Sequence, residues 1–216
     1  MRGRIPEAVA GQLRGARLYA ITPDAPPERV SMLVEGWLRG GVDIIQLRAK
    51  TLPRGEVLGL ARELAARCRA AGTLFVVNDH LDVALLAGAD GVHLGEEDLA
   101  IADARRVIEE QGERLLVGAS TTAPAVGQAA AAAGADYLGA GPAYATPIKA
   151  EKAPIGPAGV AAVQAAVEVP VFAIGGVDLD RIADLRANGV ERVCVIRALS
   201  GDDPEGAARR FLQALR

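Results

Sequence analysis

The chain has 216 residues, 50% of them hydrophobic and 24% charged, which is enough apolar sequence to bury a full core. Its 24 basic and 27 acidic residues leave a net charge of -3, which excludes a global positive field for holding nucleic acid or an anionic membrane surface. A secretion signal and a run of roughly 18 apolar residues are both lacking, and two cysteines offer no disulfide framework, so we expect a cytoplasmic protein that does not enter a membrane.

Short apolar runs alternate with stretches of helical periodicity along the whole chain. Residues 1–16 are expected to form an N-terminal extension or helix. Strands are predicted at residues 17–22, 42–48, 73–78, 90–94, 115–119, 136–140, 170–174 and 191–196. Amphipathic helices are predicted between them, for example over 54–71, 100–110 and 203–216. Eight βα units are the number that a closed barrel needs, so we predict an α/β fold, a (β/α)₈ TIM barrel, as one domain over residues 1–216.

A recurring phrase between helix and strand supports this register. It reads Gly40-Gly41-Val42-Asp43, Ala87-Gly88-Ala89-Asp90, Ala133-Gly134-Ala135-Asp136 and Asn188-Gly189-Val190-Glu191. A glycine after the last helical turn supplies the left-handed cap that lets the chain turn into the next strand. We interpret these phrases as part of the fold and not of a site.

The second predicted strand ends in Gln46, Arg48 and Lys50. Side chains two residues apart point the same way along a strand, so all three can face the mouth of a barrel. Arginine offers a planar fork for two phosphate oxygens and lysine a point charge. Both cations could instead be ordinary surface residues.

Acidic residues follow the next two predicted strands. Asp79 closes the third strand after Asn78, and Asp98 follows the fourth, so neighbouring strand ends bring the two acids within reach of one ion. Mg²⁺ typically takes one or two protein carboxylates together with substrate phosphate oxygens. The alternative is that Asp98 caps a helix that begins near Leu99.

Gly175-Gly176 after the seventh strand and Ile196-Arg197 after the eighth form a second signal. These two loops are the recurrent phosphate site of TIM barrels. The two halves together predict one ligand with a metal-bound diphosphate and another with a single phosphate. A long loop over residues 141–157 precedes the helix between the sixth and seventh strands, and loops of this length are usually lids or binding loops.

The chain resembles the thiamine phosphate synthase family from Leu18 to its carboxyl terminus. The resemblance rests on Tyr19-Ala-Ile-Thr, Gln46-Leu-Arg-Ala-Lys50, Asn78-Asp79, Gly91-Val-His-Leu-Gly-Glu-Glu-Asp98, Gly118-Ala-Ser120, Gly139-Ala-Gly-Pro-Ala-Tyr-Ala-Thr146-Pro-Ile-Lys149 and Ala173-Ile-Gly-Gly-Val177. It implies an enzyme that joins hydroxymethylpyrimidine diphosphate to hydroxyethylthiazole phosphate, or to the carboxylated form of the latter. The implied products are thiamine phosphate and diphosphate, and the implied cofactor is Mg²⁺.

The resemblance also implies a role for each matching position. Asp79 and Asp98 would hold Mg²⁺. The pyrimidine diphosphate would be bound by Gln46, Leu47, Arg48, Ala49, Lys50, Asn78, Ser120 and Lys149. Of these, Arg48, Lys50, Ser120 and Lys149 would be catalytic, because they would stabilise charge on the leaving group. The thiazole phosphate would be bound by Thr146, Pro147, Ile148, Gly176, Ile196 and Arg197.

Three positions depart from the family pattern. Ile148 stands where a second Thr is usual, Arg197 replaces a small residue that is commonly Ser, and Thr122 occupies a position where many relatives have His. The related thiazole tautomerases use a His after the fifth strand for proton transfer, and Thr122 cannot titrate near neutral pH. A barrel that only binds a phosphorylated metabolite is a third reading, which leaves the paired acids without a purpose. His80 and His93 are interpreted as packing or hydrogen-bonding neighbours of the metal, and Tyr144 as either a substrate contact or a packing residue.

Overall fold

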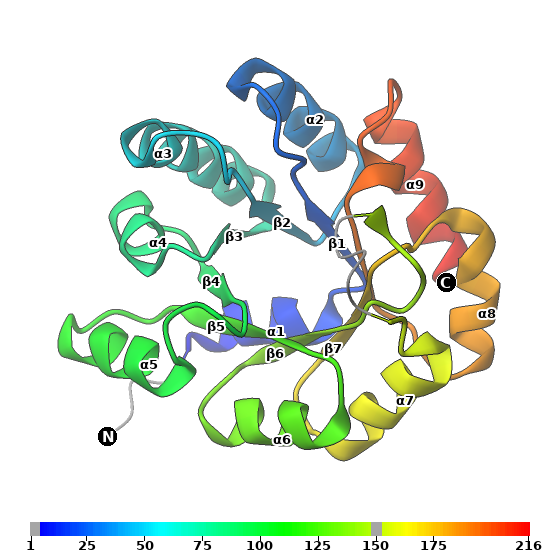
Figure 1. Cartoon of the computed structure of the whole chain (residues 1–216). Coiled ribbons are helices and arrows are strands. Elements are labelled where there is room, and N and C mark those ends of the chain that lie inside the picture. The colour runs from blue at the N-terminus through cyan, green and yellow to red at the C-terminus, as the bar shows by residue number, and fades with distance from the viewer. Residues whose placement is uncertain (1–4, 148–152) are drawn as a thin grey trace.

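Eight parallel strands close into one barrel in chain order, and the helices surround it in the same order (Figure 1). This computed structural model describes residues 5–147 and 153–216. The strands are β1 (Leu18–Ile21), β2 (Ile44–Leu47), β3 (Leu74–Asn78), β4 (Gly91–Leu94), β5 (Leu116–Thr121), β6 (Tyr137–Ala140), β7 (Val171–Ile174) and β8 (Val193–Val195). All eight lie where the apolar runs predict them, so the predicted (β/α)₈ barrel is confirmed.

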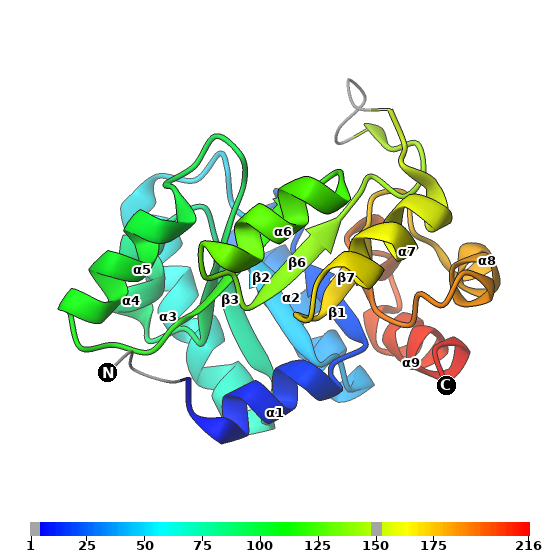
Figure 2. The same cartoon turned by 90° about the horizontal axis from the view of Figure 1, so that it is seen from below.

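The helices surround the wall of the barrel, with one exception. They are α1 (Glu7–Gly15), α2 (Pro27–Gly40), α3 (Arg54–Ala71), α4 (Leu81–Ala87), α5 (Ile101–Glu110), α6 (Pro124–Ala132), α7 (Gly156–Ala166), α8 (Ile182–Ala187) and α9 (Pro204–Ala214). The 3₁₀ turn η2 (Leu179–Arg181) precedes α8, and the 3₁₀ turn η3 (Arg197–Leu199) follows β8. The exception is α1, which lies across the end of the barrel where the strands begin (Figure 2). Its Leu13 packs with the side chains of the barrel interior. Within the described ranges, no helix is both long and apolar enough to cross a membrane.

The barrel interior is filled by aromatic side chains. The rings of Tyr19, Tyr137 and Phe172 meet edge to face with centroids 5.5–6.0 Å apart. The Tyr19 and Tyr137 hydroxyls lie 2.9 Å apart, and the Gln46 amide donates to Tyr19 Oη at 2.6 Å. Gly118 leaves the space that the Tyr137 ring occupies, since a Cβ there would lie 2.1 Å from Tyr137 Cζ. With α1 below and these rings in the middle, a ligand can enter only at the carboxyl ends of the strands.

Three acids of the recurring phrase tie neighbouring strands together at the closed end. Asp43 accepts from the Leu18 amide at 2.9 Å, Asp90 from the Phe75 amide at 2.8 Å and Asp136 from the Val117 amide at 2.8 Å. In each case the acid precedes an even-numbered strand and bonds to the start of the strand before it. The interpretation of these phrases as part of the fold is therefore confirmed.

Helices α2 and α9 approach closely because α2 presents glycine to its partner. A Cβ on Gly36 would lie 2.5 Å from Pro204 Cγ, and one on Gly40 would lie 2.5 Å from Ala208 Cβ. Small residues on both sides thus set the distance between these helices. They lie next to the place where the first strand, β1, pairs with the last, β8, and closes the barrel.

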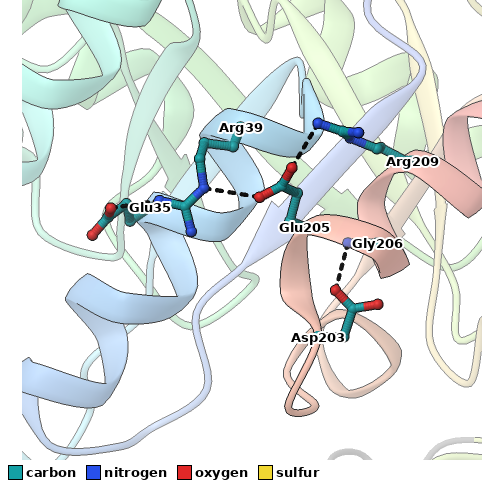
Figure 3. A network of polar contacts seen from close by, with 6 residues as sticks. All are labelled: Glu35, Arg39, Asp203, Glu205, Gly206 and Arg209. Carbon is teal, nitrogen blue, oxygen red and sulfur yellow. Dashed lines mark hydrogen bonds and ion pairs between the residues drawn. The ribbon is translucent and has the colours of Figure 1, made fainter.

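A chain of surface ion pairs runs over the same contact (Figure 3). Arg39 Nε lies 2.9 Å from Glu205 Oε2, and Glu205 Oε1 lies 2.6 Å from Arg209 Nη2. Asp203 caps α9, since its Oδ1 accepts from the Gly206 amide at 2.8 Å (Figure 3). Exposed pairs of this kind contribute little to stability, so the close helix contact beneath them is the main link.

Candidate active site

The predicted acid pair and a cation meet at the carboxyl ends of β2, β3 and β4. Lys50 Nζ, after β2, lies 3.2 Å from Asp79 Oδ2, after β3. The carboxyl of Asp98, after β4, lies close enough to the Asp79 carboxyl to affect its pKa. Burial raises the pKa of Asp79, the neighbouring Asp98 raises it further, and Lys50 acts in the opposite direction. Two neighbouring carboxylates beside a single lysine carry a net negative charge, so a further positive charge would be attracted to this place.

The backbone holds both acids in place. Asp79 has φ 64°, in the left-handed region, and the His80 amide donates to the Asn78 carbonyl across it at 2.7 Å. The Asp79 amide in turn donates to the His93 carbonyl of β4 at 2.9 Å. A non-glycine residue in this conformation costs about 1–3 kcal/mol and is typical of functional sites. The sequence offered no signal for it.

Asp98 does not cap a helix, so the alternative explanation for this residue is wrong. Helix α5 begins only at Ile101, and Ala100 precedes it without a side-chain cap. The Asp98 carboxylate accepts instead from the Gly95 amide at 2.7 Å, while the Asp98 amide donates to the Gly95 carbonyl at 3.3 Å. This short loop orients the acid toward Asp79.

The other predicted residues of the β2 end lie in different environments. Gln46 is 1% exposed and points into the barrel, where it bonds to Tyr19. Leu47 points the opposite way, into the apolar layer between sheet and helices, and Ala49 packs against that layer. Side chains alternate along a strand, so only backbone atoms of Leu47 can face a ligand.

The segment after β2 is braced by the loop after β1, which sequence reasoning missed. The Arg48 amide donates to Thr22 Oγ1 at 2.9 Å, and the Lys50 amide donates to Asp24 Oδ1 at 3.2 Å. Arg48 is partly buried, whereas the Lys50 side chain is 53% exposed. These two hydrogen bonds hold the backbone of this cationic segment in one conformation, although the exposed Lys50 side chain extends along the surface to Asp79.

Ser120 lies near the end of β5 and contacts a histidine of β4. Its Oγ is 3.1 Å from His93 Nε2, and His93 is buried. The prediction that His93 serves in packing or hydrogen bonding is confirmed by this contact. His80 likewise contacts a side chain, since its Nδ1 lies 2.9 Å from Arg54 Nη2.

A cavity of about 380 Å³ opens over β5 to β8. Five of the predicted site residues line it, namely Ser120, Thr146, Gly176, Ile196 and Arg197. Its wall also contains Glu96, Thr122, Asp178, Arg181 and Cys194, of which only Thr122 had been singled out as a position near the site. Arg48, Lys50, Asp79 and Asp98 are not part of this wall, so the acid pair lies beside the cavity and not inside it. Pro147 is exposed outside the wall, and Ile148 and Lys149 lie outside the described residues.

The Gly175-Gly176 turn forms one side of this cavity. Both residues have positive φ, 92° and 65°. A Cβ on Gly175 would lie 2.6 Å from Pro142 Cβ, and one on Gly176 would lie 2.7 Å from the Ala145 carbonyl oxygen. The turn therefore needs glycine twice over, for its backbone conformation and for the close approach of the loop after β6.

Comparisons with known proteins identify the family. A family model described as thiamine monophosphate synthase matches residues 18–199. A thiamine-phosphate synthase from Gloeobacter violaceus is 45% identical over 96% of this chain, and one from Thermosynechococcus vestitus is 43% identical over 94%. The chain spans only 61% and 57% of the length of these two relatives. A solved thiamine phosphate pyrophosphorylase from Pyrococcus furiosus is 33% identical with a TM-score of 0.85, covering 96% of this chain and 97% of its own. A 3-hexulose-6-phosphate synthase, 20% identical with a TM-score of 0.72 over 92% of this chain and 99% of its own, shares the fold.

Proposed function

Because the chain belongs to the thiamine monophosphate synthase family, we propose that it joins 4-amino-2-methyl-5-hydroxymethylpyrimidine diphosphate to 4-methyl-5-(2-hydroxyethyl)thiazole phosphate or its carboxylated form. The products would be thiamine phosphate and diphosphate. The observation that carries the proposal is the ion pair of Lys50 with Asp79, with Asp98 nearby, at the rim next to a cavity of ligand size.

The two substrates would occupy the two halves of the mouth. The diphosphate would lie over the ends of β2 to β4, where Arg48, Lys50 and the acid pair are. The thiazole phosphate would occupy the cavity over β5 to β8, with its phosphate near Gly176 and Arg197. Support comes from charge, since guanidinium and backbone N–H groups suit a monophosphate. Ser120 would face both ligands, because it lines the cavity and bonds to His93 on the strand that leads to Asp98.

The residues at the rim fit Mg²⁺. Asp79 and Asp98 would hold it, and the observation in favour is that burial and the neighbouring Asp98 carboxyl both raise the pKa of Asp79. Among the described residues, no group of three or more His, Cys, Asp and Glu side chains gathers into a metal site. A pair of carboxylates alone suits Mg²⁺, which keeps several waters and takes phosphate oxygens from substrates. When bound, the ion would supply Lewis-acid stabilisation of the negative charge on the departing diphosphate.

The chain's own residues would act on the leaving group and exclude side reactions. The C–O bond to diphosphate breaks with its electron pair on oxygen, and Lys50, Arg48 and the Ser120 hydroxyl would stabilise that charge. The thiazole nitrogen then donates its lone pair to the pyrimidinylmethyl carbon, so the reaction needs no protein nucleophile. Cys194 lines the cavity, but burial raises its pKa, which keeps the thiol protonated. Lys149 would add a further cation; we expect Lys149→Ala to keep fold and substrate binding and to lose most turnover.

The decisive test mixes purified protein with both phosphorylated precursors, with and without Mg²⁺, and follows diphosphate release. We expect release only with both substrates and the ion. No release under any condition would overturn the proposed function.

The role of the acid pair is tested by the double variant Asp79→Asn with Asp98→Asn. We expect it to fold and to lose turnover by roughly 10²-fold or more, as the loss of fixed charge stabilisation typically does. Asp103→Asn is the matched control, because Asp103 is a half-exposed acid of α5 whose Oδ1 lies 3.1 Å from Arg106 Nη2. If the double variant kept wild-type turnover at low Mg²⁺, the acid pair would not be the metal site.

A further inference from the structure

The segment over residues 141–147, which follows β6, is fastened to the end of β7. The Ala143 amide donates to the Ile174 carbonyl at 2.7 Å, and the Tyr144 amide donates to the Gly175 carbonyl at 3.0 Å. The same segment carries Thr146, which lines the cavity. Its position therefore determines the shape of the cavity wall.

A single side chain of this segment reaches over to η2 and α8. Tyr144 Oη donates to Asp184 Oδ2 at 2.8 Å, and the guanidinium carbon of Arg181 lies 4.5 Å from the centroid of the Tyr144 ring. Arg181 also donates to the Gly176 carbonyl, and its Nε lies 3.5 Å from Asp178 Oδ2. Tyrosine, arginine and aspartate thus form one connected group around the Gly175-Gly176 turn.

The contact is tight enough to transmit a displacement. A Cβ on Gly176 would lie 2.9 Å from Tyr144 Cβ and 3.0 Å from Arg181 Nη1, so no side chain separates the turn from the group. Arg181 is in the cavity wall, whereas Tyr144 does not line the cavity. Moving the tyrosine would move Gly176 and Thr146 without removing any atom that faces a ligand.

We propose that Tyr144, Arg181 and Asp184 form a latch that holds the 141–147 segment on the Gly175-Gly176 turn, and that Tyr144 is a positioning residue for the monophosphate ligand. This rests on the proposed function for the identity of the ligand. The latch itself depends only on the contacts of the protein. Tyr144 acts through Gly176 and Thr146, so it affects binding of the thiazole phosphate and leaves departure of diphosphate unchanged.

The test is Tyr144→Phe, which removes the hydroxyl and keeps the ring over Arg181. We expect KM for the thiazole phosphate to rise about three- to tenfold, the factor that one hydrogen bond is typically worth. The kcat and the KM for the pyrimidine diphosphate should stay within about twofold. Asp184→Ala should give the same rise, and the double variant should be no worse than either single variant, because both remove one bond.

Two variants serve as controls. Asp184→Asn keeps an acceptor for the tyrosine hydroxyl and should restore most of the affinity. Asp180→Ala removes an exposed acid from η2, the 3₁₀ turn that contains Arg181, and should change nothing. Equal rises in KM for both substrates, or a rise with Asp180→Ala, would contradict a specific latch.

A second readout does not need activity. In ligand-free protein, hydrogen exchange of the Ala143 and Tyr144 amides should become about three- to tenfold faster in Tyr144→Phe, since losing one hydrogen bond favours local opening by that factor. Exchange in β3 should not change. Unchanged exchange at both amides would overturn the latch even in an active enzyme. Faster exchange in a protein that never releases diphosphate would keep the latch and overturn the proposed function alone.

Discussion

Gly118 tests how completely the aromatic core determines the barrel. The φ of Gly118 is not positive, so its backbone conformation does not require glycine. Gly118→Ala therefore introduces only a methyl group. That methyl would lie 2.1 Å from Tyr137 Cζ, 2.4 Å from its hydroxyl oxygen and 2.5 Å from its Cε2. Carbon atoms in contact lie at about 3.5 Å, so the ring has to retreat by about 1.4 Å.

Packed neighbours prevent the Tyr137 ring from retreating. Tyr137 is fully buried, its hydroxyl lies 2.9 Å from that of Tyr19, and its edge contacts Phe172 with centroids 6.0 Å apart. Overpacking of a filled core costs about 1–3 kcal/mol, and the lost hydroxyl contact adds about 1 kcal/mol. We therefore expect the free energy of unfolding to fall by about 2–4 kcal/mol, a large part of the roughly 5–15 kcal/mol of a typical domain.

Urea denaturation followed by circular dichroism measures this change. Gly139→Ala is the matched control, because a Cβ there would lie 3.5 Å from its nearest neighbour, His93 Cε1, an ordinary contact. In a Tyr137→Ala background, Gly118→Ala should cost less than about 1 kcal/mol, since the obstructing ring is gone. A loss below about 1 kcal/mol in the wild-type background would refute the reasoning.

Three further outcomes follow from burial and packing. Burial raises the pKa of all three tyrosines, that of Tyr144 to about 12 with a further contribution from its bond to a carboxylate. Because these folded values exceed the unfolded value of about 10, the associated stability is complete below pH ~10 and is lost as the pH rises through the folded values; phenolate absorbance from native protein at pH ~10 would contradict this. Burial also raises the pKa of the Cys68 thiol to about 12, so a thiol reagent at neutral pH should label Cys68 only after unfolding, and rapid labelling of Cys68 in the native protein would show that it is accessible. Gly40→Ala places a methyl 2.5 Å from Ala208 Cβ and should lower the free energy of unfolding by about 1–3 kcal/mol in urea; an equal or higher value would mean that α9 shifts freely.

Much of the fold was readable from local patterns. Each strand is a short, mostly apolar run, because most of its side chains are buried on one face or the other of the sheet. The glycines at 41, 88, 134 and 189 all have positive φ, as the recurring phrase predicts. Both the apolar runs and the glycines depend only on neighbours along the chain, so they can be recognised without knowing which distant residues they contact.

Part of the candidate site was also readable. Adjacent parallel strands end at the same rim, so Asp79 and Asp98 could be predicted to meet once the strand order was known. The predicted roles of Lys149 and Ile148 stay predictions, because these residues lie outside the described ones.

Other features depend on contacts that no local pattern contains. The left-handed turn at Asp79 exists because β3 and β4 hold its neighbours, and the acid of Asp98 turns back to Gly95 in place of capping a helix. Tyr144 and Asp184 are 40 residues apart and meet only because β7 lies beside β6.

The sequence by itself determined the number and order of the strands, the glycines between them and the chemical types of the side chains at the rim. The tertiary structure alone decided which of those side chains face one another, where the cavity ends and what braces its wall. The physical reason is range: strand formation and turn conformation depend on neighbours along the chain, whereas side-chain contacts depend on how a closed barrel brings distant residues together.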